Sequence, residues 1–245
     1  MESLPPTARL LIHLHRRLLG SAFWLLYNPF AWAYDWVSGT FFAGQWRVWQ
    51  RAVIPPLVGA GGRVLEVGCG TGDLQADLRA AGYASVGVDL SPAMLRVARC
   101  KAGRGGAVLR LVRAQSAALP FPAAAFAAVV STFPSDYIFA PATLAEIVRV
   151  LRPGGRLVVV PVGVLLPVDR RSRLLDRLTG LVYGRPQAGG AGEARCQALL
   201  AAFRAGPAFG PLEARLRAAG FRVHTQVGVG PRSLVLVVIA DKPGA

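Results

Sequence analysis

The stretch that most constrains how this chain can fold is residues 64–73, which read VLEVGCGTGD. The first four residues are mostly apolar and β-branched and predict a short buried strand. Glycine then occupies positions 68, 70 and 72, and the apolar periodicity that follows predicts a helix over residues 73–81. A strand, a glycine turn and a helix bring bare backbone and a helix N-terminus against a ligand. The stretch therefore predicts a binding site at the end of this strand.

The charges around the turn indicate what kind of ligand it takes. The glycines follow a G-x-G-x-G pattern, with Asp73 where the dinucleotide fingerprint G-x-G-x-x-G has its third glycine. Glu66 stands inside the strand end, where a carboxylate is costly to bury without a partner. Two acids at this turn would repel a pyrophosphate and suit a ligand that carries cationic groups.

A second predicted strand also ends near an acidic residue. Residues 85–89 predict a strand that ends at Asp89, seventeen residues after Gly72. A carboxylate at that position can accept hydrogen bonds from both hydroxyls of a ribose, and bonds to a charged acceptor are the stronger kind. Ser91 and Pro92 then predict the N-cap and first residue of the next helix.

These motifs carry a family resemblance. The chain resembles the class I S-adenosylmethionine-dependent methyltransferases, in their small-molecule branch. The resemblance is strong over residues 60–161 and weak over residues 211–243. Its blocks, in chain order, are VLEVGCGTG, VGVDLSPAML, ALPF and EIVRVLRPGGR.

The order of the predicted elements gives the fold class, α/β. Strands alternate with helices, which indicates a parallel sheet covered by helices on both faces. The resemblance implies a Rossmann-like, seven-stranded, mostly parallel sheet with an antiparallel last strand, and an N-terminal helical lid. We expect strands at residues 63–67, 85–89, 108–112, 126–131, 156–161, 221–227 and 233–240, and helices at 73–81, 92–101, 141–151 and 212–219.

The chain divides into two parts. Residues 60–245 are expected to form the S-adenosylmethionine-binding domain. Within it, residues 162–210 resemble an insertion that covers the substrate, or alternatively form a solvated pair of surface helices. That segment holds a basic amphipathic stretch at 170–181 and a second predicted helix near 193–204. Residues 1–59 precede the domain.

Ligands of such sheets bind beyond the carboxyl ends of the strands, which gathers distant residues around one crevice. The resemblance implies that Gln115 accepts from the adenine amino group, at a position that is usually Asp, and that the Ser116 backbone N–H donates to the ring. Leu90 would pack on the adenine, although a core position or an exposed loop explains Leu90 and Gln115 equally. The predicted cofactor contacts are Tyr34, Glu66, Gly68, Cys69, Gly70, Gly72, Asp89, Leu90, Gln115, Ser116 and Ser131.

The loop after the fourth expected strand, residues 131–137, should face both the methyl donor and the acceptor. It lacks the N/D-P-P-Y/F pattern of adenine and amide methylators, which argues against DNA or a glutamine amide as acceptor. Asp136 is a candidate general base and Tyr137 a candidate group for orienting a phenol or enolate. A helix N-cap and a packed tyrosine are the alternatives, so no catalytic residue is assigned.

The N-terminal residues 1–59 hold all five tryptophans and a long uncharged run. That run is broken by Asn28 and Pro29, and is too short to predict a transmembrane helix. It predicts a helical lid over the cofactor, a lid that also touches an anionic membrane, or, less favoured, a signal peptide. Tyr34-Asp35 matches a Tyr-Asp pair that related methyltransferases often carry in such a segment.

The net charge is +15, and 26 of the 28 basic residues are arginine because Lys101 and Lys242 are the only lysines. This charge favours an anionic partner, or it reflects a solvated basic surface with an arginine-rich composition. The three cysteines have no metal-ligand spacing, so no metal site is predicted. We expect a cytoplasmic protein, either free or peripheral to the inner face of the membrane; the oligomeric state stays open.

The function predicted is direct, in-line transfer of a methyl group from S-adenosylmethionine to a small, apolar or lipid-like acceptor. Alignment of the reactants supplies most of the acceleration in such a reaction. An RNA or DNA methyltransferase is an alternative suggested by the charge, without a recognition module to support it. A non-catalytic cofactor-binding module is the other. The sequence leaves the acceptor and its accepting atom open.

Overall fold

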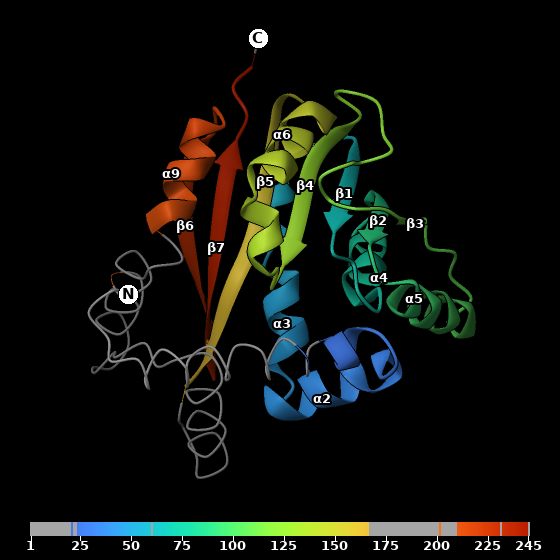
Figure 1. The fold of residues 1–245 in the computed structure, drawn as a ribbon. Coiled ribbons are helices and arrows are strands. Elements are labelled where there is room, and N and C mark those ends of the chain that lie inside the picture. The colour runs from blue at the N-terminus through green and yellow to red at the C-terminus, as the bar shows by residue number, and fades with distance from the viewer. Residues whose placement is uncertain are drawn as a thin grey trace, which may run out of the picture.

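The structure is a computed structural model that describes residues 21, 24–59, 61–166, 201, 210–230 and 232–244. Its centre is a seven-stranded sheet in the order β3-β2-β1-β4-β5-β7-β6 (Figure 1). The strands are β1 (Arg63–Val67), β2 (Ala84–Asp89), β3 (Leu111–Arg113), β4 (Phe126–Thr132), β5 (Leu151–Leu165), β6 (Arg222–Val229) and β7 (Ser233–Asp241).

The first five strands pair in parallel, and β7 pairs antiparallel with both β5 and β6. The predicted fold class is therefore confirmed. The strand order reverses at β1, with β2 on one side and β4 on the other, which is where open α/β sheets bind their ligands. The short runs of valine and leucine explain why the central strands are buried on both faces.

Helices cover both faces of the sheet, and alternate residues of each strand point to opposite faces. Val64 packs in a cluster with residues of α3 (Gln45–Arg51), η2 (Pro55–Leu57) and α4. Leu65 packs in a second cluster with residues of η3, α6 and α9. The helices of the domain are α4 (Asp73–Ala80), α5 (Pro92–Arg104), η3 (Asp136–Phe139), α6 (Pro141–Val150) and α9 (Gly210–Ala218).

The fifth strand is much longer than predicted. It was expected to end at residue 161, but residues 162–165 continue the antiparallel pairing with β7, so they lie in the sheet and not in the insertion. Gly163 makes this extension compatible with the N-terminal segment, because a Cβ there would collide with the indole ring of Trp49. The rest of the proposed insertion, including the stretches at 170–181 and 193–204, lies outside the described residues apart from residues 166, 201 and 210.

The other boundaries shift by a few residues. The helix α5 runs on to Arg104 because no glycine or proline interrupts it before residue 103, and β3 is displaced toward the C-terminus to Leu111–Arg113. A short 3₁₀ helix, η3, occupies part of the loop that follows β4. Among the described residues, no helix combines the length and apolar character needed to cross a membrane.

The N-terminal segment packs beyond the C-terminal ends of the parallel strands (Figure 1). Trp49 is buried, and Trp46 stacks on Phe133 with ring centroids 4.1 Å apart. The Ser233 hydroxyl, at the start of β7, donates to the side-chain carbonyl of Gln45 over 2.9 Å. Among the described residues of the segment, the elements include η1 (Ala31–Ala33), α2 (Tyr34–Phe41), α3 (Gln45–Arg51) and η2 (Pro55–Leu57).

Candidate active site

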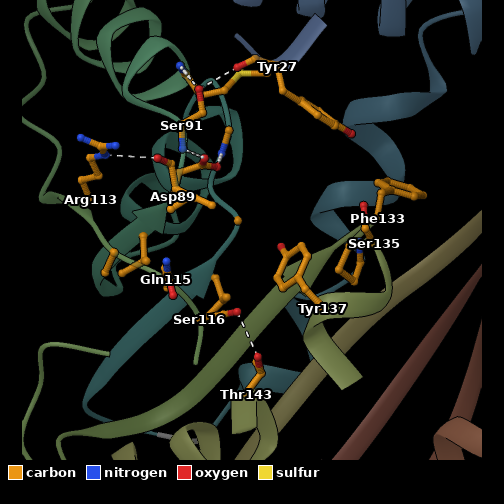
Figure 2. A pocket seen from close by; sticks show the side chains of 18 of the residues that line it. Tyr27, Asp89, Ser91, Arg113, Gln115, Ser116, Phe133, Ser135, Tyr137 and Thr143 are labelled. Carbon is orange, nitrogen blue, oxygen red and sulfur yellow. Dashed lines mark hydrogen bonds between the residues drawn. The ribbon is translucent and has the colours of Figure 1, made fainter. Parts of the chain in front are cut away.

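A pocket of about 800 Å³ opens at the C-terminal ends of β1, β2 and β4, beneath the N-terminal segment (Figure 2). Its walls come from the glycine turn, the tip of β2, the segment after β3, the loop after β4 and the N-terminal helices. Eight residues singled out from the sequence line it: Tyr34, Gly68, Gly70, Asp89, Leu90, Gln115, Ser116 and Tyr137.

The glycine turn presents bare backbone to this pocket. Gly68 has a φ of 79° and Gly70 a φ of 50°, a region that side-chain-bearing residues rarely adopt. A Cβ on Gly68 would collide with the hydroxyl of Tyr137. The turn is tied down by the Gly68 N–H, which donates to the Val88 carbonyl over 2.8 Å. Residue 68 must therefore lack a side chain for the pocket to keep this shape.

The carboxylate of Asp89 organises the tip of β2. It accepts a hydrogen bond from the Gly70 N–H at one oxygen and from the Ser91 N–H at the other, both over 2.8 Å (Figure 2). Burial raises the pKa of Asp89 above its ordinary value, and the hydrogen bonds from the Ser91 and Gly70 N–H groups offset only part of this rise. The carboxylate thus joins the two turns that flank the pocket, and it is a hydrogen-bond acceptor on the pocket wall.

Glu66 lies behind the pocket wall. It is 1% exposed, and its carboxyl accepts a 2.8 Å hydrogen bond from the Gln75 amide, whose own oxygen accepts from Ser85. Burial raises the pKa of Glu66 to about 8, with a further contribution from the Asp89 carboxylate. The group is therefore largely protonated at neutral pH. The hydrogen bond from Gln75 gives Glu66 a role in joining β1 to α4. Contact between Glu66 and the cofactor stays a prediction.

Three other predicted contacts also lie behind the wall. The Cys69 side chain is buried against Gly87, where a Cβ would come within 2.9 Å of the sulfur. A Cβ on Gly72 would come within 2.9 Å of Ala98, so this glycine admits helix α5. The buried Ser131 hydroxyl donates to the Val67 carbonyl over 2.7 Å. Cofactor contact by these three residues stays a prediction.

The wall formed by the residues that follow β2 and β3 holds polar and apolar groups together. Leu90 is 58% exposed although it lines the pocket, and the Arg113 guanidinium donates to its carbonyl. Gln115 and Ser116 follow β3, and the Ser116 hydroxyl lies 3.0 Å from that of Thr143 at the start of α6 (Figure 2). This wall offers an apolar side chain beside amide and hydroxyl groups.

The loop after β4 forms the opposite wall. Phe133 has a φ of 50°, a strained value for a bulky residue, and its ring lies under Trp46. Tyr137 faces the pocket across from Asp89 (Figure 2). Burial in the wall and the nearby Asp89 carboxylate raise the pKa of Tyr137, so this phenol stays protonated at neutral pH and can donate a hydrogen bond. The side chain of Asp136 lies outside the described part of the structure.

The N-terminal segment contributes pocket residues that the sequence reasoning did not identify. Trp24, Tyr27 and Asn28 line the pocket beside Tyr34, and the rings of Tyr27 and Tyr34 are 5.6 Å apart. The Ser91 hydroxyl donates to the Tyr27 carbonyl over 2.6 Å, which ties the segment to the start of α5. The uncharged aromatic run was the signal for these residues, but it does not indicate which of its members turn inward.

An ion-pair cluster fastens α2 and α3 to the glycine turn. The Lys101 ammonium on α5 contacts Asp35 at 2.5 Å and Asp73 at 2.6 Å, and the Thr71 hydroxyl donates to Asp35 over 2.6 Å. Arg47 on α3 also pairs with Asp73, at 2.9 Å. We call these five residues the lid latch. Asp35 of the Tyr34-Asp35 pair therefore points to the latch, whereas Tyr34 points to the pocket.

Metal ligands do not gather in this region. In the ranges that the structure covers, no group of three or more His, Cys, Asp or Glu side chains is placed to hold a metal ion.

Comparisons with known proteins agree with this arrangement. A family model described as a methyltransferase domain matches residues 64–155. A demethylmenaquinone methyltransferase of Thermus thermophilus is 40% identical over 75% of this chain and 84% of its own length. One of Deinococcus radiodurans is 38% identical over 58% of this chain and 60% of its own length. Nothing in these comparisons favours a nucleic-acid methyltransferase or a non-catalytic module.

A solved structure shows the same fold. The phosphoethanolamine N-methyltransferase 2 of Haemonchus contortus, in complex with S-adenosylmethionine, superposes with a TM-score of 0.56 at 16% identity, over 87% of this chain and 56% of its own. The sheet, the glycine turn and the relatives lead to one conclusion: the chain belongs to the class I S-adenosylmethionine-dependent methyltransferases, and it is an enzyme that uses S-adenosylmethionine as its methyl donor.

Proposed function

We propose that the acceptor is a reduced quinone of the demethylmenaquinone type, a naphthoquinol with an isoprenoid tail. The observation that carries this proposal is the relative named demethylmenaquinone methyltransferase, which matches this chain at 40% identity over 84% of the relative's length. The aromatic wall of the pocket supports it, because fused rings stack well on aromatic side chains. That wall contains Tyr27, Tyr34, Phe133 and Tyr137.

The shape of the pocket fits the donor. Gly68 and Gly70 present backbone that a side chain would cover, and Asp89 offers the acidic acceptor that ribose hydroxyls require. We propose that these three residues hold the donor with Tyr34, and that Leu90, Gln115 and Ser116 hold its adenine. When bound, S-adenosylmethionine supplies a sulfonium methyl group that passes in line to the acceptor, and a neutral thioether leaves.

The acceptor must be electron-rich at carbon, which favours the quinol over the quinone. A ring carbon of the quinol uses its electron pair to form the new C–C bond while the C–S bond of the donor breaks, and the same carbon then loses its proton. Protonated Tyr137 can donate a hydrogen bond to a quinol oxygen and hold the ring in line. Asp136 stays the predicted general base that accepts this proton. Its side chain lies outside the described part of the structure.

We also propose that the enzyme works at the cytoplasmic face of a membrane. An acceptor with an isoprenoid tail partitions into lipid, while the methyl donor is cytosolic. The net charge of +15 supports attraction to anionic headgroups.

The test is methyl transfer from labelled S-adenosylmethionine to a short-chain demethylmenaquinone, with and without chemical reduction. The expected result is a product with one added ring methyl group, formed only from the reduced acceptor. Asp89→Ala serves as the impaired control because it removes the proposed ribose contact. Tight cofactor binding by calorimetry without any transfer to the quinol would refute the proposed acceptor and leave the family assignment intact.

A further inference from the structure

The N-terminal segment exposes a set of large aromatic side chains to solvent. Trp32 is 72% exposed and Trp36 is 73% exposed, and they lie one helical turn apart along η1 and α2, which places them on one side. Large contiguous apolar surface is uncommon on a protein that meets only water, and it marks an interaction site. We call the following residues the aromatic face: Trp24, Phe30, Trp32 and Trp36.

The tryptophans of this segment divide into two groups by environment. Trp46 and Trp49 point inward, onto Phe133 and into the core, whereas the three tryptophans of the aromatic face are 62–73% exposed. Packing against the domain therefore accounts for two of the five. A helical segment with one side docked and the other side aromatic has the two-sided character of an interfacial element.

The aromatic face also lacks charge. Between residues 18 and 46 the only charged residue is Asp35, and its carboxylate is held by Lys101 and Thr71 of the lid latch. A surface made for a charged protein partner would carry exposed charges of its own. An uncharged face rich in tryptophan on a chain of net charge +15 suits the boundary between headgroups and acyl chains of an anionic bilayer.

The aromatic face borders the mouth of the pocket. Trp24 lines the pocket and is 62% exposed, so it belongs to both surfaces. Leu90 also lines the pocket and is 58% exposed. An acceptor that leaves the bilayer beside the aromatic face would therefore meet the pocket without crossing water.

We propose that the aromatic face docks on a lipid bilayer, with its tryptophans among the headgroups and the pocket mouth against the membrane. The inference rests on the proposed function, because a lipid-borne quinol is what makes this placement useful. It goes further by assigning the contact to a named surface and by committing to lipid, not protein, as the occupant.

The test uses the full chain and the double variant Trp32→Ala/Trp36→Ala in flotation with vesicles of phosphatidylglycerol and phosphatidylcholine. Neither side chain lines the pocket, and both are too exposed to support the core. We expect vesicle partitioning to fall about tenfold or more, because two large apolar groups no longer leave water. The matched control is Val108→Ala/Val229→Ala, at 78% and 70% exposure outside the N-terminal segment, which should bind vesicles as the wild type does.

Methyl transfer separates docking from chemistry. The tryptophan variant should keep the wild-type rate with a soluble short-chain quinol and lose most of it with a long-chain quinol embedded in vesicles. Unchanged vesicle binding by the variant would overturn the proposal, as would a wild type that does not float with vesicles. A wild-type dimer that the variant converts to monomer, without vesicle binding, would assign the face to a second copy of the chain. Failure of the soluble assay alone would refute the proposed acceptor, since the flotation result does not depend on it.

Discussion

The two walls of the pocket are built by different means. On the side that we propose to hold the donor, called the donor side, the backbone of the glycine turn and the Asp89 carboxylate define the surface, and main-chain N–H groups of Gly70 and Ser91 donate to that carboxylate. On the lid side, side-chain rings define the surface, such as that of Phe133, which lines the pocket and on which Trp46 of the N-terminal segment stacks. Backbone geometry is set by local sequence, whereas ring stacking depends on residues far apart in the chain.

The same contrast applies to how the two sides are held. The donor side is part of the parallel sheet, because β1 and β2 pair through five residues each. The lid side is held by Trp49 in the core and by the lid latch at the surface. One side is thus fixed by cooperative strand pairing, and the other by a buried anchor and an ionic contact that salt can screen.

The largest effect should come from the buried anchor. Trp49→Ala should lower the free energy of unfolding by about 3–5 kcal/mol, because Trp49 is 1% exposed and fills the space over Gly163. Urea denaturation measures it. Trp36→Ala, at 73% exposure, should change the same quantity by less than about 0.5 kcal/mol. Equal effects of the two variants would mean that α3 is not part of the core.

The next effect concerns the donor side. Asp89→Ala should weaken S-adenosylmethionine binding by about 1.5–3 kcal/mol, because hydrogen bonds to a charged acceptor are lost. Calorimetric titration measures the affinity, and circular dichroism checks that the variant keeps its overall secondary structure when the Gly70 and Ser91 N–H groups lose their acceptor. Asp89→Asn keeps one acceptor oxygen, so its affinity for S-adenosylmethionine should lie between those of the wild type and Asp89→Ala. Wild-type affinity in both variants would place the ribose elsewhere in the pocket.

The donor side could be predicted from sequence because its signals are local. The glycines at 68, 70 and 72 and the acid at 89 lie next to strands that the apolar pattern marks clearly. The pattern does not say which way each side chain points. Glu66 and Cys69 alternate with core residues, and only the packing of α4 and of Gly87 turns them away from the pocket.

The lid side could be predicted only as a segment. The uncharged aromatic run indicates helices near the site, but not that Tyr27 lines the pocket while Trp32 meets solvent. Those positions depend on tertiary contacts, such as the hydrogen bond from the Ser91 hydroxyl to the Tyr27 carbonyl. The length of β5 was also missed, because its last residues form a strand only through pairing with β7.

A pH experiment tests whether the buried Glu66 carboxyl is protonated in the folded protein. Its pKa is about 8 in the folded protein against 4.5 when solvated, so between those values the unfolded chain has released a proton that the folded chain keeps. Stability should therefore fall as pH rises through this window, by up to about 1.4 kcal/mol per pH unit from this group. Glu66→Gln should remove that part of the slope in urea denaturation across pH. An unchanged slope would mean that Glu66 is ionised in the folded state.

The smallest effect should come from the lid latch. Lys101→Met should lower the free energy of unfolding by about 1 kcal/mol, because Lys101 and Asp35 are each about one third exposed and solvent screens their attraction. Limited proteolysis should show the change in Lys101→Met more clearly than unfolding does. Because the N-terminal segment is released more often, protease should cut it faster in this variant, while the sheet stays protected.

Two variants make the latch experiment specific. Lys101→Arg keeps the charge and should restore most of the protection. Arg217→Met removes the Arg217–Glu213 pair far along the chain, in which Arg217 is 63% exposed, and should leave cleavage unchanged. High salt should move the wild type toward Lys101→Met, because the latch is ionic. If salt and Lys101→Met leave the cleavage rate as it was, the lid is held by Trp49 and its neighbours alone, and the two sides of the pocket differ less in how they are fastened than the ion pairs suggest.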